Sequence, residues 1–212
     1  MKDKLQSKLY IMLPLLTLAL LCAVLLFIVN EFTHKKIQDN ARIYKLRMIE
    51  SVMSLPHDND LYNDFIEVTD PSIFNTDQPV TVFRMRKGKQ SIGVIFFPVI
   101  AKGYSGNIEL TIGIAYDGTI MGVQVLKQHE TEGMGDRIVP EKSDWLGHFT
   151  DHSLENTPLE AWTVSADGGQ FDELSGATIT SRGVVNAVRN TLEYYKFNRD
   201  KLYRMSINME EE

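Results

Sequence analysis

The sequence predicts an α+β protein in which one N-terminal transmembrane helix precedes a domain built on an antiparallel sheet with flanking helices. Three observations support this fold class. Residues 9–30 carry no charged side chain, residues 107–116 alternate strictly between apolar and polar or small side chains, and residues 181–195 carry apolar side chains at helical spacing. These patterns are typical of a membrane-spanning helix, a half-buried strand and an amphipathic helix.

The composition agrees with this division. The chain has 212 residues, 22 Lys and Arg, 28 Asp and Glu and one Cys, so a disulfide framework is excluded and a strongly basic nucleic-acid binder is not expected. Residues 31–212 alone carry 19 basic and 27 acidic side chains, a net charge of −8. We therefore expect a membrane anchor that carries an acidic domain, with no nucleic acid among its partners.

The first predicted element is the anchor. A short tail, residues 1–8, precedes the apolar residues 9–30, and about 20 helical residues span roughly 30 Å, the thickness of the hydrocarbon core of a bilayer. A cleaved signal peptide would be shorter and followed by small residues, and a lipoprotein start at Cys22 would need Gly or Ala where Leu21 stands. We expect a retained, single-pass anchor.

The charges that flank the anchor leave its orientation open. Three lysines precede it, and five basic residues follow it between residues 35 and 47. This difference mildly favours a cytoplasmic domain, but long domains often cross the membrane regardless of such flanks.

Residues 31–54 are predicted to form an amphipathic helix that connects the anchor to the domain, residues 55–212. Its apolar or small side chains recur at spacings of three and four residues: Ile37, Ala41, Tyr44, Met48 and Val52. Pro56 disfavours a helical residue before it, so the helix should end near Ser54, ahead of a polar, turn-rich segment. A mobile charged linker is the alternative interpretation.

Four strands are predicted in the centre of the domain: Val80–Met85, Ile92–Val99, Asn107–Tyr116 and Thr119–Leu126. Asp117-Gly118 separates the last two, and this dipeptide between alternating runs indicates a hairpin with a type I′ turn, in which both central residues have positive φ. We expect an antiparallel sheet with one face on a core.

The last predicted element is a helix that begins near Ser181. Its buried stripe comprises Val185, Val188, Leu192 and Tyr195, and Thr180 or Ser181 is a natural N-cap. The polar tail from Asn198 onward is expected to be loose.

The segment before this helix is the candidate site. Four hydroxyl side chains lie within seven residues, at Ser175, Thr178, Thr180 and Ser181. The N-terminus of a helix favours anions, so a phosphate near Thr178 would lie in a favourable field. The plainer interpretation is a capped helix after a tight turn.

The string from Asp172 to Thr178, Asp-Glu-Leu-Ser-Gly-Ala-Thr, resembles the recognition motif of flavin transferases. These enzymes attach FMN through its phosphate to the hydroxyl of the last Thr of the motif. The resemblance implies covalent FMN on Thr178 and recognition by the transferase through Asp172. It also implies cofactor contacts from the neighbouring residues Ser175, Gly176, Ala177, Thr180 and Ser181.

Four further segments resemble the G subunit of the Rnf (or Rsx) electron-transport complex in order and spacing: GYSGNIEL at 103–110, DGTIMG at 117–122, HETEGMGD at 129–136 and SDW at 143–145. This resemblance implies a subunit that relays electrons through FMN during ferredoxin/NAD electron transfer coupled to ion transport, and that is not a catalyst on its own. It also implies a location in the inner membrane, with the N-terminus inside and the domain in the periplasm, and the other subunits of the complex as partners.

The loop at residues 129–136 departs from the pattern of that family, Glu-Thr-Pro-Gly-Leu-Gly. Glu132 stands where Pro is usual and Met134 where Leu is usual, so we expect a looser turn with an added negative charge. The resemblance makes Met134 a contact of the flavin ring and Glu130 and Thr131 its polar neighbours. A metal site made by His129 and the acidic residues of this loop is the alternative, but we expect a solvated acidic turn and no metal.

Two other functions are kept open. The C subunit of a sodium-pumping NADH:quinone reductase shares the anchor, the motif and the flavin. A membrane-anchored sensor or binding domain without a redox role would use Ser-Gly-Ala-Thr only as a helix cap. We identify no nucleophilic triad, dinucleotide-binding Gly-rich motif or Walker loop. Trp145 and Phe149 are expected to pack in the core, with Trp145 stacking near a flavin as the alternative.

Overall fold

A computed structural model of the chain describes residues 2–53 and 55–204 and confirms the predicted α+β fold. The chain divides into two units, Met1–Lys45 and Leu46–Glu212. A single helix, α1 (Lys2–Ser51), contains both the predicted anchor and most of the predicted connecting helix. It ends at Ser51 and not near Ser54, because Val52 already leaves the helix to pack against the sheet.

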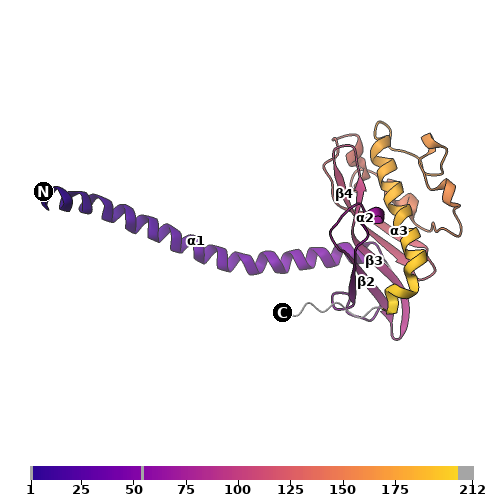
Figure 1. The fold of residues 1–212 in the computed structure, drawn as a ribbon, viewed down its shortest axis with the longest axis horizontal. Helices are drawn as coiled ribbons and strands as arrows, with labels where there is room; N and C mark the ends of the chain where they lie inside the picture. The colour runs from indigo at the N-terminus through magenta and orange to yellow at the C-terminus, as the bar shows by residue number, and fades with distance from the viewer. Residues whose placement is uncertain (1, 54, 205–212) are drawn as a thin grey trace. The chain divides into compact units, whose positions relative to one another are not determined.

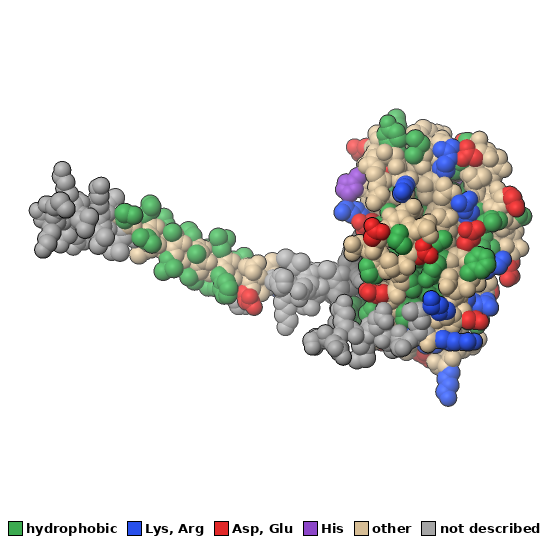
Figure 2. All heavy atoms as spheres, in the orientation of Figure 1, with side chains coloured by type: hydrophobic (Ala, Val, Ile, Leu, Met, Phe, Trp, Pro, Cys, Tyr) green, Lys and Arg blue, Asp and Glu red, His purple; other side chains and the backbone are tan. Residues whose placement is uncertain are grey.

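Within α1, the stretch Pro14–Glu31 is long and apolar enough to cross a membrane. Its mean hydropathy is 2.2, and none of it is buried. Figure 2 shows hydrophobic side chains along this stretch, as expected for a surface that faces lipid. The predicted stripe residues Ile37, Ala41 and Tyr44 lie outside the described side chains.

Five antiparallel strands, each paired with the next along the chain, form the sheet of the described residues in the order β1-β2-β3-β4-β5. Their bounds are β1 Phe65–Val68, β2 Val80–Lys87, β3 Gln90–Lys102, β4 Asn107–Ala115 and β5 Ile120–Lys127. The four predicted strands correspond to β2–β5. The strand β1 and the one-turn helix α2 (Pro71–Phe74) were not predicted, because segments of four residues show no clear periodicity.

The turn between β4 and β5 differs from the predicted type I′ turn. Gly118 has a positive φ of 94°, but Asp117 does not. The Gly118 N–H donates to the Ala115 carbonyl (2.9 Å), and the Ala115 N–H donates to the Thr119 carbonyl (2.8 Å). This is the pattern of a three-residue loop in which a glycine in the left-handed region forms a bulge, so only one residue needs positive φ.

The long C-terminal helix α3 (Thr178–Arg204) packs on one face of the sheet, where it buries all four predicted stripe residues (Figure 1). The helix continues beyond Asn198, where a loose tail was expected, because Leu202 is also buried in the core. Residues 205–212 of the predicted tail lie outside the described residues.

The second face of the sheet is also covered, although only one buried face was predicted. A second apolar cluster joins the end of α1 to β2 and β3 through Ile49, Val52, Met53, Leu61, Phe83, Met85 and Ile95. The end of α1 therefore folds as part of the domain. Short 3₁₀ helices complete the described part of the domain: η1 Gly135–Ile138, η2 Trp145–Phe149, η3 Leu159–Ala161 and η4 Ser165–Asp167.

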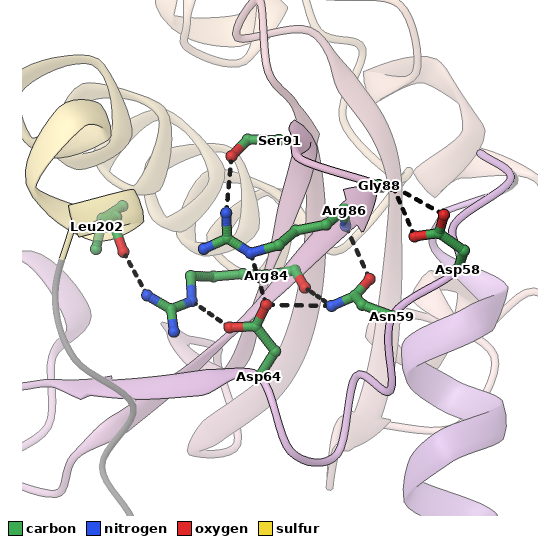
Figure 3. Close-up of polar contacts among 8 residues, drawn as sticks. All are labelled: Asp58, Asn59, Asp64, Arg84, Arg86, Gly88, Ser91 and Leu202. Carbon is green, nitrogen blue, oxygen red and sulfur yellow. Dashed lines mark hydrogen bonds and ion pairs between the residues drawn. The ribbon is translucent and has the colours of Figure 1, made fainter.

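The polar segment between α1 and β1 is tied to β2 by side-chain contacts (Figure 3). The carboxylate of Asp64 accepts hydrogen bonds from Nε of Arg84 (2.6 Å) and Nε of Arg86 (2.7 Å). Arg84 also donates from Nη1 to the Leu202 carbonyl at the end of α3 (3.3 Å). The segment predicted as turn-rich thus links α3 and the sheet to the end of α1.

Candidate functional site

A cavity of about 520 Å³ opens where the β3–β4 turn, the loop after β5 and the first turn of α3 meet. Its lining consists of Tyr104, Glu130, Thr131, Met134, Gly135, Gly176, Ala177, Thr178, Ile179 and Thr180. Seven of these were predicted as site residues, and the fold brings them together from two distant segments. Tyr104, Gly135 and Ile179 were not predicted, although the first two belong to the segments GYSG and EGMG that carried the resemblance.

The helix α3 begins at Thr178, three residues before the predicted start, so Thr180 and Ser181 are not N-caps. Both hydroxyls turn toward neighbouring loops. Ser181 Oγ accepts a hydrogen bond from the Leu174 N–H (3.0 Å) and donates to the Ala177 carbonyl (3.1 Å). Ser181 is fully buried and does not line the cavity, so its role is to fix the loop that enters the helix.

Thr178 differs from the other hydroxyl residues of the motif. It lines the cavity, and within the described part of the chain its hydroxyl has no hydrogen-bond partner. Ser175 is exposed and lies outside the cavity lining. The backbone N–H groups of Thr178, Ile179 and Thr180 likewise have no partner among the described residues, as expected for the first turn of a helix. A free hydroxyl and free N–H donors therefore meet at one end of the cavity.

Glu130 connects the three segments that form the cavity. Its side chain is 8% exposed, and its carboxylate accepts hydrogen bonds from the N–H groups of Tyr104 (3.3 Å) and Ser105 (2.9 Å) and from the hydroxyl of Thr180. Hydrogen bonds to a charged group are stronger than neutral ones, so this carboxylate holds the β3–β4 turn and the start of α3 against its own loop.

Arg137 makes a second connection between the loop and the motif. Its Nη2 donates to the Ser175 carbonyl (3.1 Å), and its Nε donates weakly to the Met134 carbonyl (3.4 Å). Arg137 was not predicted, because a charged residue beside a flexible loop is ordinary in a sequence. In the fold, Arg137 links the loop after β5 to the loop that precedes α3.

Asp136, in the same loop, does not line the cavity and is 3% exposed. The hydrogen bond that it accepts from the Lys142 ammonium group holds the pKa of Asp136 below its ordinary value. Glu132, which stands at the position where the resembled family has Pro, is exposed. Among the described residues, no three His, Cys, Asp or Glu side chains are grouped to hold a metal ion.

Trp145 and Asp172 meet outside the cavity. The indole Nε1 of Trp145 donates to the Asp172 carbonyl (2.6 Å), and the ring packs edge-on against Phe149, with 5.4 Å between centroids. Trp145 thus belongs to the core and anchors the start of the motif, and it does not line the cavity. The side chain of Asp172 is exposed, so a protein that recognises the motif can reach it.

Comparison with known proteins places this cavity inside a matched region. Residues 103–193 match the FMN-binding domain family, and they include every residue of the cavity lining. The G subunit of an ion-translocating oxidoreductase complex from Shewanella loihica is 34% identical and covers 91% of both chains. The corresponding proteins of Shewanella piezotolerans (35%, covering 87% of both chains) and Yersinia pestis (34%, covering 90% of this chain and 92% of that one) are similarly close. The crystal structure of Shewanella oneidensis NqrC is 22% identical, covers 70% of this chain and 76% of that chain, and has a TM-score of 0.48.

Proposed function

Because the chain belongs to the family of G subunits of ion-translocating oxidoreductase complexes, we propose that it relays electrons through an FMN attached by a phosphoester to Thr178. The family and the FMN-binding domain make it a flavin-containing electron-transport subunit. One observation supports Thr178 as the attachment point. Two hydroxyl residues of this segment, Thr178 and Thr180, line the cavity, and of these two only Thr178 has a hydroxyl without a hydrogen-bond partner within the described residues.

The residues of the cavity fit an FMN. Apolar atoms of Tyr104, Met134 and Ile179 offer surfaces for a planar ring, and all three side chains are at least half exposed. The free N–H groups at the start of α3 are donors for a phosphate linked to Thr178. When bound, FMN supplies the one- and two-electron chemistry that the side chains of the chain lack.

The residues of the chain hold and shield this group. Thr178 fixes one end by a covalent bond, so the cofactor cannot be lost from the domain. Glu130 and Arg137 keep the three cavity segments together through the contacts described above. The apolar side chains of Met134 and Ile179 line the cavity, and they would reduce the access of water to the flavin ring.

The proposal also includes the setting of the domain. The helix α1 anchors the chain in the inner membrane by a single pass, with the N-terminus inside and the domain on the periplasmic side. Its partners are the other subunits of the complex, which couples ferredoxin/NAD electron transfer to ion transport, and a flavin transferase that reads Asp172 during maturation. Family membership supports this setting over the C subunit of a sodium-pumping NADH:quinone reductase.

The attachment can be tested by producing the full chain together with a flavin transferase. We expect a fluorescent band on a denaturing gel for the wild type and for Thr131→Ala, which removes another cavity hydroxyl outside the motif. Thr178→Val should give no band, and mass spectrometry should find FMN on the wild-type peptide that contains Thr178. Covalent flavin on Thr178→Val would refute the attachment. Wild-type protein from its own host without covalent flavin would favour the sensor alternative.

A further inference from the structure

Glu130 is a buried acid at the cavity wall that the proposed attachment does not use. Building on the proposed function, we propose that Glu130 places a fixed negative charge beside the cavity and so lowers the reduction potential of the flavin attached to Thr178. Glu130 is then an electrostatic tuning residue, whose charge acts on the cofactor in addition to its role in joining the cavity segments.

Hydrogen-bond donors surround the carboxylate of Glu130. Each of the three groups that face it, the N–H of Tyr104, the N–H of Ser105 and the hydroxyl of Thr180, is a donor. Thr180 is also the third residue of α3, and the N-terminal end of a helix stabilises a negative charge. In every one of these contacts the carboxylate is the acceptor.

Within the described residues no cation pairs with this carboxylate, and the guanidinium of the nearby Arg137 donates to the carbonyls of Ser175 and Met134 instead. Glu130 forms no ion pair among them, whereas the other buried acid of the same loop, Asp136, is paired with the ammonium group of Lys142. The donors to Glu130 are neutral dipoles, which stabilise the charge without cancelling it. A net negative charge therefore remains at a site that is 8% exposed, where water screens it weakly.

The sign of the effect follows from Coulomb's law. Reduction brings an electron into the cavity, and a like charge on the cavity wall makes this less favourable. Glu130 and Thr178 both line the cavity, so the carboxylate lies on the wall of the space that the attached flavin would occupy. Removing the charge without removing the hydrogen-bond acceptor should raise the reduction potential.

Glu130→Gln is the direct test, because Gln has nearly the same shape and can still accept from an N–H group. The midpoint potential of the flavin-loaded full chain in detergent is measured by spectroelectrochemical titration, after a denaturing gel has shown equal loading. We expect a positive shift for Glu130→Gln. Glu155→Gln is the matched control, because this exposed acid lies beside Asp117, at the other end of β4, and should leave the potential at the wild-type value.

A second variant keeps the test decisive if Glu130→Gln fails to fold. Thr131→Lys adds a cation at an exposed position of the same cavity wall and should also shift the potential upward. An unchanged or lower potential in the folded, loaded Glu130→Gln protein, or in Thr131→Lys when only that variant folds, would overturn the inference while the attachment at Thr178 stands. Wild-type protein without covalent flavin would overturn the proposed function and this inference together.

Discussion

The backbone carbonyl oxygen of Val52 lies so close to Gly113 that a Cβ on Gly113 would be only 2.4 Å from it. Val52 directly follows α1, and Gly113 lies in the middle of β4. The residue that follows α1 thus packs directly against the backbone of the sheet. This close approach connects α1 to the strands whose other face packs against α3.

Gly113→Ala should destabilise the domain by about 1–3 kcal/mol, because the new methyl group would collide with backbone that cannot easily move. Gly147→Ala is the comparison. There the three nearest atoms all belong to the flexible side chain of Asp144, at an exposed position, so the loss should be smaller. Denaturant unfolding followed by the fluorescence of the two buried tryptophans, Trp145 and Trp162, measures both values. Equal losses of unfolding free energy in the two variants would contradict a tight approach of the Val52 carbonyl to Gly113.

Asp64→Asn should cost ~3–5 kcal/mol of unfolding free energy, because the buried guanidinium of Arg84 would lose its charged partner. Asp60→Asn provides the control. Asp60 lies in the same segment but is exposed, and its carboxylate accepts local hydrogen bonds from residues 62 and 63, so the change should stay within about 0.5 kcal/mol. The same fluorescence measurement applies, and a loss for Asp64→Asn as small as that for Asp60→Asn would refute the importance of this network.

The sequence predicted those parts of the fold that repeat a pattern over many residues. The strict alternation around Leu110 and the helical stripe around Val188 each placed an element on the core. β1 was too short for such a pattern, and the polar segment around Asp64 resembled a turn because its order comes from arginines on another strand. The second face of the sheet is buried by the end of α1, and this packing between distant segments leaves no local pattern in the sequence.

The candidate site was predictable mainly through its resemblance to a motif. The hydroxyls around Thr178 were visible in the sequence, but their different roles were not. Only the fold shows that Ser181 is buried in loop contacts while Thr178 lines the cavity. Tyr104 reaches the site from the β3–β4 turn, and Arg137 directly follows the predicted loop but contacts the motif only through the fold, so the sequence does not show that either residue belongs to the site.

The ion pair of Asp136 predicts a change in stability at acid pH. The hydrogen bond from Lys142 lowers the pKa of Asp136 in the folded state from the ordinary value of 3.8. A lowered pKa contributes stability that is fully present above the unfolded value and is lost as the pH falls through the folded value. Unfolding free energies measured from pH 6 down to pH 2 should therefore fall less steeply below about pH 4 in Asp136→Asn than in the wild type.

Lys142→Met tests the cause of this effect, because it removes the cation and leaves the acid in place. It should also flatten the acid limb of the stability profile. A Lys142→Met profile parallel to that of the wild type would show that Lys142 does not lower the pKa of Asp136.

Met134 allows the charge beside the cavity to be varied in both directions. Its side chain is 50% exposed and lines the cavity, so a charged replacement can be accommodated at the rim without unfolding the domain. For the flavin-loaded protein, Met134→Lys should raise the midpoint potential and Met134→Glu should lower it, because a positive charge favours and a negative charge opposes the arrival of an electron. Both shifts should be smaller than that of Glu130→Gln, because water screens an exposed charge more strongly than a buried one.

Met134→Leu, which keeps an apolar side chain of similar size, should leave the potential unchanged. Shifts of the same sign for Lys and Glu would indicate that the loop alters the potential through its conformation and not through charge.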